Sequence, residues 1–281
     1  MPFTLRAPAT PEEVVQLLGS TPAAEVAVLA GGTDLLLDLD DGRLRPTTVV
    51  SLRRLPWNTW QWTDGGLVVG STAPLAGLEA DPALAARLPG LYEGIRAVGS
   101  PALRHRATPG GNLGRASPAS DLIPILLALD ATVQVVGPAG PRTLGVDELI
   151  HGPRSTTLAA GELIASVTVP EPRPSTYLWQ RVRPAHDISQ VGVAAAWSAT
   201  HHRWRVALGG TWPVPALSEA AAQLGDDAHP TADALASAAE AAAREARFQT
   251  DKRASEEYRR RVLAVLFRRA IARVAATGSP S

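Results

Sequence analysis

The 281-residue sequence contains no cysteine. This absence excludes disulfides, thiolate nucleophiles, iron–sulfur ligation and a cysteinyl flavin link within the chain. Lysine is nearly absent too, since Lys252 is the only one and lies in a charged run. The chain therefore offers no good candidate for the lysine of a Schiff-base mechanism. The formal net charge is zero, whereas nucleic-acid binding usually needs a basic surplus. We therefore expect no nucleic-acid partner.

Long hydrophobic runs are also missing. The longest apolar stretch, residues 122–136, is too short to span a bilayer and includes Asp130. Residues 1–13 lack the apolar core of a signal peptide. The composition, 45% hydrophobic and 19% charged, is that of a globular protein. We therefore expect a cytoplasmic protein that is not inserted in a membrane.

The pattern along the chain predicts three parts. Residues 1–55 read as a small α/β unit, which opens with a helix start at Thr10-Pro11-Glu12-Glu13. Residues 56–172 begin with a hairpin around Gly65-Gly66 and include a buried helix over 122–129. Strands are expected over 132–136 and 164–169.

A proline-rich stretch, residues 170–174, is the best candidate for a domain boundary. In the following part, residues 173–281, two paired strands are expected over 190–200 and 204–208. Two helices are expected over 232–247 and 256–275. These elements predict an α+β C-terminal domain.

The first segment with chemical potential is Ala30-Gly31-Gly32-Thr33-Asp34, where a strand turns into a helix. Glycines let a backbone approach a ligand closely, and free N–H groups in such turns bind phosphate. The segment lacks the third glycine of the Rossmann fingerprint and the Gly-Lys-Ser/Thr of a Walker A loop. Taken alone, it is most simply an ordinary turn.

The second segment covers residues 108–121, from Thr108-Pro109-Gly110-Gly111-Asn112 to Ser120-Asp121. We expect a long irregular loop between two helices, which is typical of a ligand site. Either Ser120 or Asp121 could cap the helix that starts at Leu122. Two glycine-paired segments at element junctions could hold a pyrophosphate from two sides, mainly through backbone amides and helix N-termini.

These segments resemble the signatures of the FAD-binding medium subunit of molybdenum hydroxylases, the group that contains xanthine dehydrogenase and carbon monoxide dehydrogenase. The matching runs are Ala30–Leu35, Thr108–Asn112 and Ala116–Leu122, with a weaker match from Arg183 to Asp187. The resemblance covers essentially the whole chain. It implies an α+β fold: two α/β subdomains forming a PCMH-type (vanillyl-alcohol-oxidase-like) FAD-binding domain, followed by an α+β C-terminal domain.

The resemblance also implies which residues contact the cofactor. Relatives often have Lys near position 180 and some have Tyr at position 188, where this chain has Gln180 and Ile188. We name no catalytic residue and no metal site. The residues implied to contact FAD are Val28, Leu29, Ala30, Gly31, Gly32, Thr33, Asp34, Leu35, Thr108, Gly110, Gly111, Asn112, Ser117, Asp121, Ile164, Gln180 and Ile188.

By the same resemblance, a large subunit with the molybdenum cofactor oxidises the substrate and a small subunit with two [2Fe-2S] clusters passes electrons on. Non-covalent FAD on this chain then delivers the electrons to an external acceptor. One alternative is a self-contained FAD-dependent oxidoreductase, but the only tyrosines, Tyr92, Tyr177 and Tyr258, lie outside the FAD segments. A second alternative is a binding module that has lost FAD. The glycines of both segments are intact, which argues against this alternative.

Overall fold

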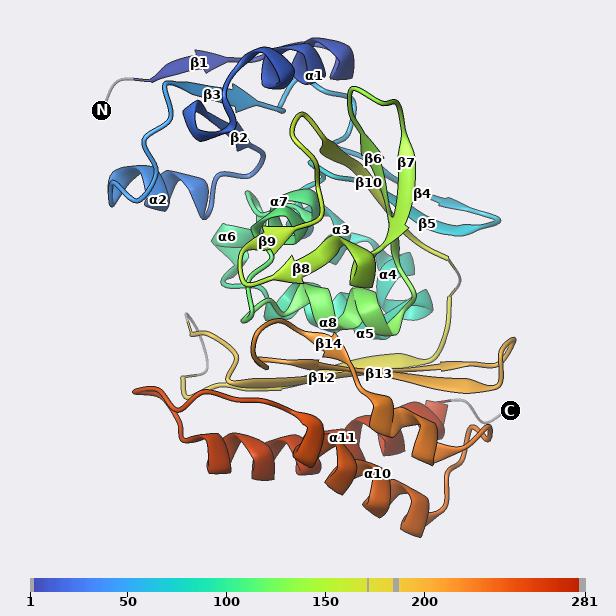
Figure 1. The fold of residues 1–281 in the computed structure, drawn as a ribbon. Helices are drawn as coiled ribbons and strands as arrows, with labels where there is room; N and C mark the ends of the chain where they lie inside the picture. The colour runs from blue at the N-terminus through green and yellow to red at the C-terminus, as the bar shows by residue number, and fades with distance from the viewer. Residues whose placement is uncertain (1–2, 171, 184–186, 278–281) are drawn as a thin grey trace.

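The computed structural model describes residues 3–170, 172–183 and 187–277, and it stacks the chain in three parts (Figure 1). The first part is a parallel sheet of order β1-β3-β2. Helix α1 starts as its sequence predicts, because the Thr10 hydroxyl accepts the Glu13 N–H at 3.2 Å and Pro11 follows the cap. The elements are β1 (Thr4–Arg6), α1 (Pro11–Ser20), β2 (Val26–Leu29), α2 (Leu35–Asp40) and β3 (Thr48–Ser51).

The second part is built on an antiparallel sheet of order β4-β5-β10-β6-β7. The expected hairpin is confirmed, since β4 pairs with β5 across Asp64–Gly65. Its strands are β4 (Trp60–Thr63), β5 (Gly66–Gly70), β6 (Thr132–Val136), β7 (Arg142–Gly145) and β10 (Leu163–Val169), with β8 (Ile150–Gly152) and β9 (Ser155–Thr156) as a small separate pair. Its helices are α3 (Leu75–Ala80), α4 (Pro82–Arg87), α5 (Pro89–Ala97), α6 (Pro101–Arg104), α7 (Pro109–Arg115), α8 (Leu122–Ala128) and α9 (Val146–Leu149).

The third part is a four-stranded antiparallel sheet with helices on both faces (Figure 1). Every residue of its strand β12 is buried. Ala194 and Ala196 face the core shared with α5 and α8, whereas Val193 and Ala195 face α10 and α11. A strand buried on both faces reads as a continuous apolar run, as this one does. The elements are β11 (Ser175–Gln180), β12 (Val191–Ser198), β13 (Arg203–Gly209), β14 (Ala216–Leu217), α10 (Ala232–Glu245) and α11 (Glu256–Thr277).

The expectation of an irregular loop over residues 108–121 is wrong for residues 109–115, whereas residues 116–121 are irregular as expected. Helix α7 occupies Pro109–Arg115, and Thr108 caps it by accepting the Gly111 N–H at 3.1 Å. Ala116, with φ of 46°, ends the helix in the left-handed region. Three glycines in seven residues give a low helix propensity, which explains the error. The Thr-Pro start is the signal that could have corrected it.

Among the described residues, no helix is both long enough and apolar enough to cross a bilayer. The weak motif from Arg183 to Asp187 includes residues 184–186, which lie outside the described part of the chain.

Candidate cofactor site

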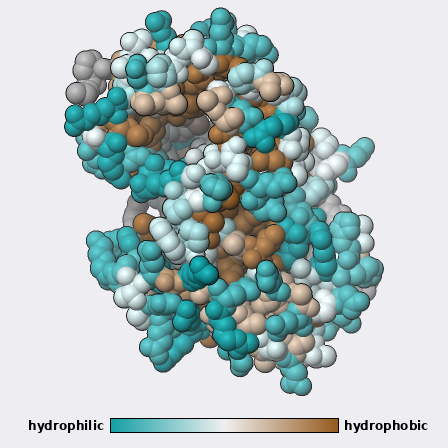
Figure 2. Space-filling model, viewed as in Figure 1, coloured by the Kyte–Doolittle hydropathy of each residue, from teal (hydrophilic) through white to brown (hydrophobic). Residues whose placement is uncertain are grey.

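A cavity of about 450 Å³ opens between the N-terminal sheet and the second part of the molecule. Its walls come from the loop between β2 and α2, from α7 and from the start of β10. Figure 2 shows the molecule hollowed beneath the N-terminal part, with hydrophobic surface around the hollow. Twelve of the residues predicted to contact a cofactor line this cavity: Val28, Ala30, Gly31, Gly32, Thr33, Asp34, Leu35, Thr108, Gly110, Gly111, Asn112 and Ile164.

The other five predicted residues are not brought to the cavity wall: Leu29, Ser117, Asp121, Gln180 and Ile188. The Ser117 hydroxyl accepts the Ala119 N–H, and the Gln180 amide donates to the Arg181 carbonyl. Asp121 is buried against Tyr177 and Arg181. Ile188 is half-exposed and lines a separate, smaller pocket.

The first glycine loop lies unusually close to a neighbouring backbone. A Cβ on Gly31 would lie 1.9 Å from the Arg106 carbonyl oxygen, so only glycine allows this approach. Gly32 has φ of +80°, which an L side chain rarely adopts. Within the described residues, the backbone N–H groups of Gly31, Gly32 and Thr33 donate to no protein acceptor. Three adjacent free donors on a cavity wall suit an anionic group such as a pyrophosphate.

Two glycines leave part of the cavity-facing side of helix α7 without side chains. Gly111 and Gly114 are one turn apart, and both line the cavity. A Cβ on Gly114 would meet nothing within 4 Å, so it would project into open space. Gly114 was not among the predicted residues. Its spacing from Gly111 could have identified it once residues 109–115 were read as a helix.

The first turn of α7 offers fewer free backbone donors than expected. The Gly110 N–H donates to the Ser71 carbonyl at 2.9 Å, and the Gly111 N–H donates to the Thr108 hydroxyl. These donors are already used inside the protein. The free amides of the loop from Gly31 to Thr33 are therefore the main donors for an anion, and α7 supplies a flat wall.

Arg115, the one arginine among the described residues that line the cavity, is held in ion pairs. Arg115 lies 2.5 Å from Asp38 and 3.4 Å from Asp34, while Arg43 pairs with the other carboxylate oxygen of Asp38 at 3.2 Å. Burial acts to raise the pKa of Asp38, but its hydrogen bond to Arg115 and the charges of Arg115, Arg43 and Arg154 outweigh this, so the pKa lies below the usual value. The charge of Arg115 is thus compensated within the protein. Backbone dipoles remain the main attraction for a phosphate.

Ser120 connects helix α8 to the cavity wall. Its hydroxyl oxygen accepts the N–H groups of Leu122 and Ile123 at 3.2 and 3.1 Å, so Ser120, and not Asp121, caps α8. The same hydroxyl donates to the Asn112 Oδ1 at 2.7 Å. Because the Ser120 hydroxyl already accepts two N–H groups, it can only donate its proton to Asn112, so Asn112 must present its oxygen to Ser120. The Asn112 NH₂ group then remains available on the cavity side.

Replacing Ser120 with alanine is expected to lower the free energy of unfolding by about 2 kcal/mol, because it removes a helix cap and the partner of Asn112. It should also weaken cofactor binding, because the Asn112 amide loses its fixed orientation. Thr231→Ala is the matched control, since Thr231 caps α10 through the Ala234 N–H, far from the cavity. Thermal unfolding and ligand titration of both variants check this. Equal ligand affinity in the two variants would contradict the role of Ser120 at the cavity.

Comparison with known proteins identifies the class to which this arrangement belongs. A family model described as the FAD binding domain in molybdopterin dehydrogenase matches residues 1–172. A second, described as the CO dehydrogenase flavoprotein C-terminal domain, matches residues 177–274. The nicotine 6-hydroxylase medium subunit of Paenarthrobacter nicotinovorans is 31% identical over 94% of this chain and 94% of its own length.

Solved structures agree with this assignment. A structure of carbon monoxide dehydrogenase from Hydrogenophaga pseudoflava matches with a TM-score of 0.90 and 26% identity, covering 98% of each chain. Quinoline 2-oxidoreductase from Pseudomonas putida 86 matches with a TM-score of 0.89 and 27% identity, covering 99% of this chain and 98% of the other.

The fold and the glycine-lined cavity define a flavoprotein subunit of an oxidoreductase, with an FAD-binding domain and a C-terminal domain. More narrowly, the chain belongs to the family of FAD-binding medium subunits of molybdenum hydroxylases. The cofactor of this family is FAD, and the residues of the cavity fit it. The free amides of the first loop suit its pyrophosphate, and the glycine face of α7 leaves room beside them.

Proposed function

We propose that the cavity between the first glycine loop and α7 is the FAD site, with the pyrophosphate against the amides of Gly31, Gly32 and Thr33. The observation that carries this proposal is the set of three N–H groups that have no acceptor among the described residues, on the wall of a cavity that glycines keep open. Asn112 would donate its amide to the cofactor from the opposite wall. Val28 and Ile164 offer apolar contact.

When bound, FAD supplies the redox chemistry, accepting electrons from one carrier and passing them to another. The chain's own residues bind the cofactor, orient it and exclude water from it. The charged residues of the cavity wall in the described structure are already engaged: Asp34 and Asp38 pair with Arg115, and Glu162 pairs with Arg142 at 2.7 Å. This favours electron transfer over acid–base catalysis on a substrate bound here.

The alternative of a self-contained oxidoreductase is less well supported. Each of the three tyrosines lies in the described part of the chain, and none lines the cavity. Tyr177 is fully buried with its hydroxyl bonded to Asp121 at 2.8 Å, and Tyr258 is on the surface. No tyrosine is therefore placed to act on a substrate beside the cofactor.

We further propose that the chain works beside a large subunit with the molybdenum cofactor and a small subunit with two [2Fe-2S] clusters. Relatives named as the medium subunit of a nicotine 6-hydroxylase and the medium chain of a carbon monoxide dehydrogenase support this. The lack of cysteine is consistent with it, because iron–sulfur clusters are held by thiolates and must then be on another chain. The cytoplasmic location remains a prediction.

The test is direct. The full chain is purified, its visible spectrum is recorded, and any bound nucleotide is released and identified. Released FAD, or uptake of added FAD by a colourless preparation, is the expected result. If the chain, both alone and co-expressed with its neighbouring subunits, neither carries nor takes up FAD, the proposed site is wrong.

A further inference from the structure

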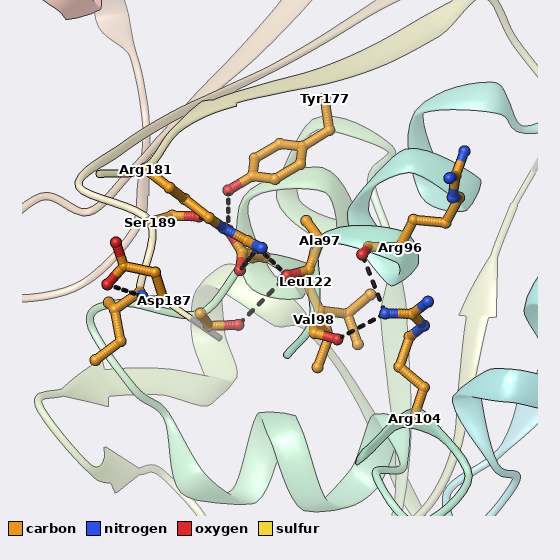
Figure 3. A network of polar contacts seen from close by, with 12 residues as sticks. Arg96, Ala97, Val98, Arg104, Leu122, Tyr177, Arg181, Asp187 and Ser189 are labelled. Carbon is orange, nitrogen blue, oxygen red and sulfur yellow. Dashed lines mark hydrogen bonds and ion pairs between the residues drawn. The ribbon is translucent and has the colours of Figure 1, made fainter. Parts of the chain in front are cut away.

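Arg181 is a buried guanidinium at the junction between the C-terminal sheet and the FAD-binding domain. It directly follows β11, and only 8% of its side chain is exposed. Its Nη2 donates to the Ala97 carbonyl and lies 3.1 Å from Asp121 Oδ2, while its Nε donates to the Ser189 hydroxyl at 3.3 Å. Figure 3 shows the side chain reaching from its own segment toward Ala97. One residue of the C-terminal domain thus bonds to two segments of the FAD-binding domain.

The first of these segments is the end of α5, whose last carbonyls have no partner within the helix. Arg104 donates to the carbonyls of Arg96 and Val98 at 3.2 and 3.1 Å, and Arg181 donates to the carbonyl between them (Figure 3). Two arginines therefore fix three consecutive carbonyls. Val98, the residue after Ala97, lines the cavity. Both guanidinium groups thus bond to the backbone at this part of the wall.

The second segment is the start of α8. Asp121 is buried and accepts the Tyr177 hydroxyl at 2.8 Å in addition to its ion pair with Arg181. Ser120, the preceding residue, holds the Asn112 amide at the cavity. Arg181 is therefore also connected to the wall at Asn112, through Asp121 and Ser120, although it does not itself line the cavity.

We propose that Arg181 is a positioning residue for FAD: it sets the separation of the walls at Val98 and Asn112 and so couples the placement of the C-terminal domain to the cofactor site. This proposal rests on the proposed function, because it needs FAD to occupy the cavity. A lysine at this position would keep the charge but could not reach Ala97, Asp121 and Ser189 together, because its single ammonium lacks the planar fork.

Arg205 provides a matched control. It also belongs to the C-terminal sheet, and it donates to the carbonyl of Leu127 on α8 at 3.0 Å and pairs with Asp130 at 2.9 Å. Neither Arg205 nor these two partners line the cavity. Arg205→Gln therefore removes a comparable contact between the domains without touching either wall.

The experiment measures the dissociation constant of FAD and the thermal unfolding of the wild-type chain, Arg181→Gln, Arg181→Lys and Arg205→Gln, with the visible circular dichroism of bound flavin as a second readout. We expect Arg181→Gln to weaken FAD binding at least ~10-fold and to alter the flavin spectrum, with Arg181→Lys in between. Arg205→Gln should lose thermal stability but keep its FAD affinity within about twofold.

Equal FAD affinity in Arg181→Lys and Arg205→Gln, with the same flavin spectrum, would overturn the proposal. Removing the arginine leaves Asp121 buried without its countercharge, and this could prevent Arg181→Gln from folding. The comparison of Arg181→Lys with Arg205→Gln does not depend on that variant. Failure of the wild-type chain to bind FAD would instead contradict the proposed function, so the two failures are distinguishable.

Discussion

Replacing Gly114 with leucine is expected to abolish FAD binding while leaving the free energy of unfolding nearly unchanged. A Cβ at this position meets nothing within 4 Å outside its own turn of helix, and Gly114 lines the cavity, so the larger side chain would extend into the cavity of the free protein. Leucine also has a higher helix propensity than glycine. The side chain would instead fill the space beside α7 that the proposal gives to FAD. We expect a loss of affinity of at least ~100-fold, or ~2.7 kcal/mol.

The measurement is a titration of the cofactor-free chain with FAD, followed by flavin fluorescence, together with thermal unfolding. Gly19→Leu is the matched control, because Gly19 lies in helix α1 and a Cβ there also meets nothing within 4 Å. Gly19 does not line the cavity. If Gly114→Leu bound FAD as well as Gly19→Leu does, the glycine face of α7 would not be part of the site.

Much of the fold could be predicted because its elements have strong local signals. The start of α1 is set by its Thr-Pro-Glu-Glu run, and the hairpin at β4 and β5 by its glycine pair. Strand β12 and helix α11 follow from a continuous apolar run and from helical periodicity. The family resemblance supplied the domain order and the cofactor. The division at residues 170–174 remains a prediction.

What could not be predicted depends on contacts between distant segments. Helix α7 is glycine-rich and forms because Thr108 caps it and Ser71 accepts its Gly110 N–H, a contact from 39 positions earlier in the chain. Strand β11 was missed because its partner, β12, decides whether residues 175–180 are extended. Local propensity carries no information about either partner.

The same limit applies to the site. The two glycine segments were found because glycine is required wherever a backbone approaches a ligand or another backbone. Asp121 was also predicted to contact the cofactor, but its surroundings come from Tyr177 and Arg181 in another domain. A motif gives the residue type that a family retains at a position. The direction of that side chain depends on partners that the motif does not include.

Gly31→Ala is expected to lower both stability and FAD affinity, in contrast to Gly114→Leu. The new Cβ would lie 1.9 Å from the Arg106 carbonyl oxygen and 3.3 Å from the Ala107 Cα, and backbone atoms cannot yield as a flexible side chain can. The first loop would have to move away from residues 106 and 107. That shift should cost about 1–3 kcal/mol in the free energy of unfolding and displace the three free amides from their common site. FAD affinity should fall at least ~10-fold.

Gly65→Ala is the appropriate comparison, because Gly65 lies in the hairpin turn and its nearest contact to a Cβ is the Thr63 hydroxyl at 3.8 Å. Chemical denaturation and FAD titration of both variants separate two explanations. If Gly31→Ala lost stability but bound FAD normally, the close approach to Arg106 would serve only to join the two subdomains. If Gly31→Ala lost both stability and FAD affinity, one loop would serve two purposes. The loop that packs against Arg106 and joins the subdomains would also hold the amides of the anion site in place.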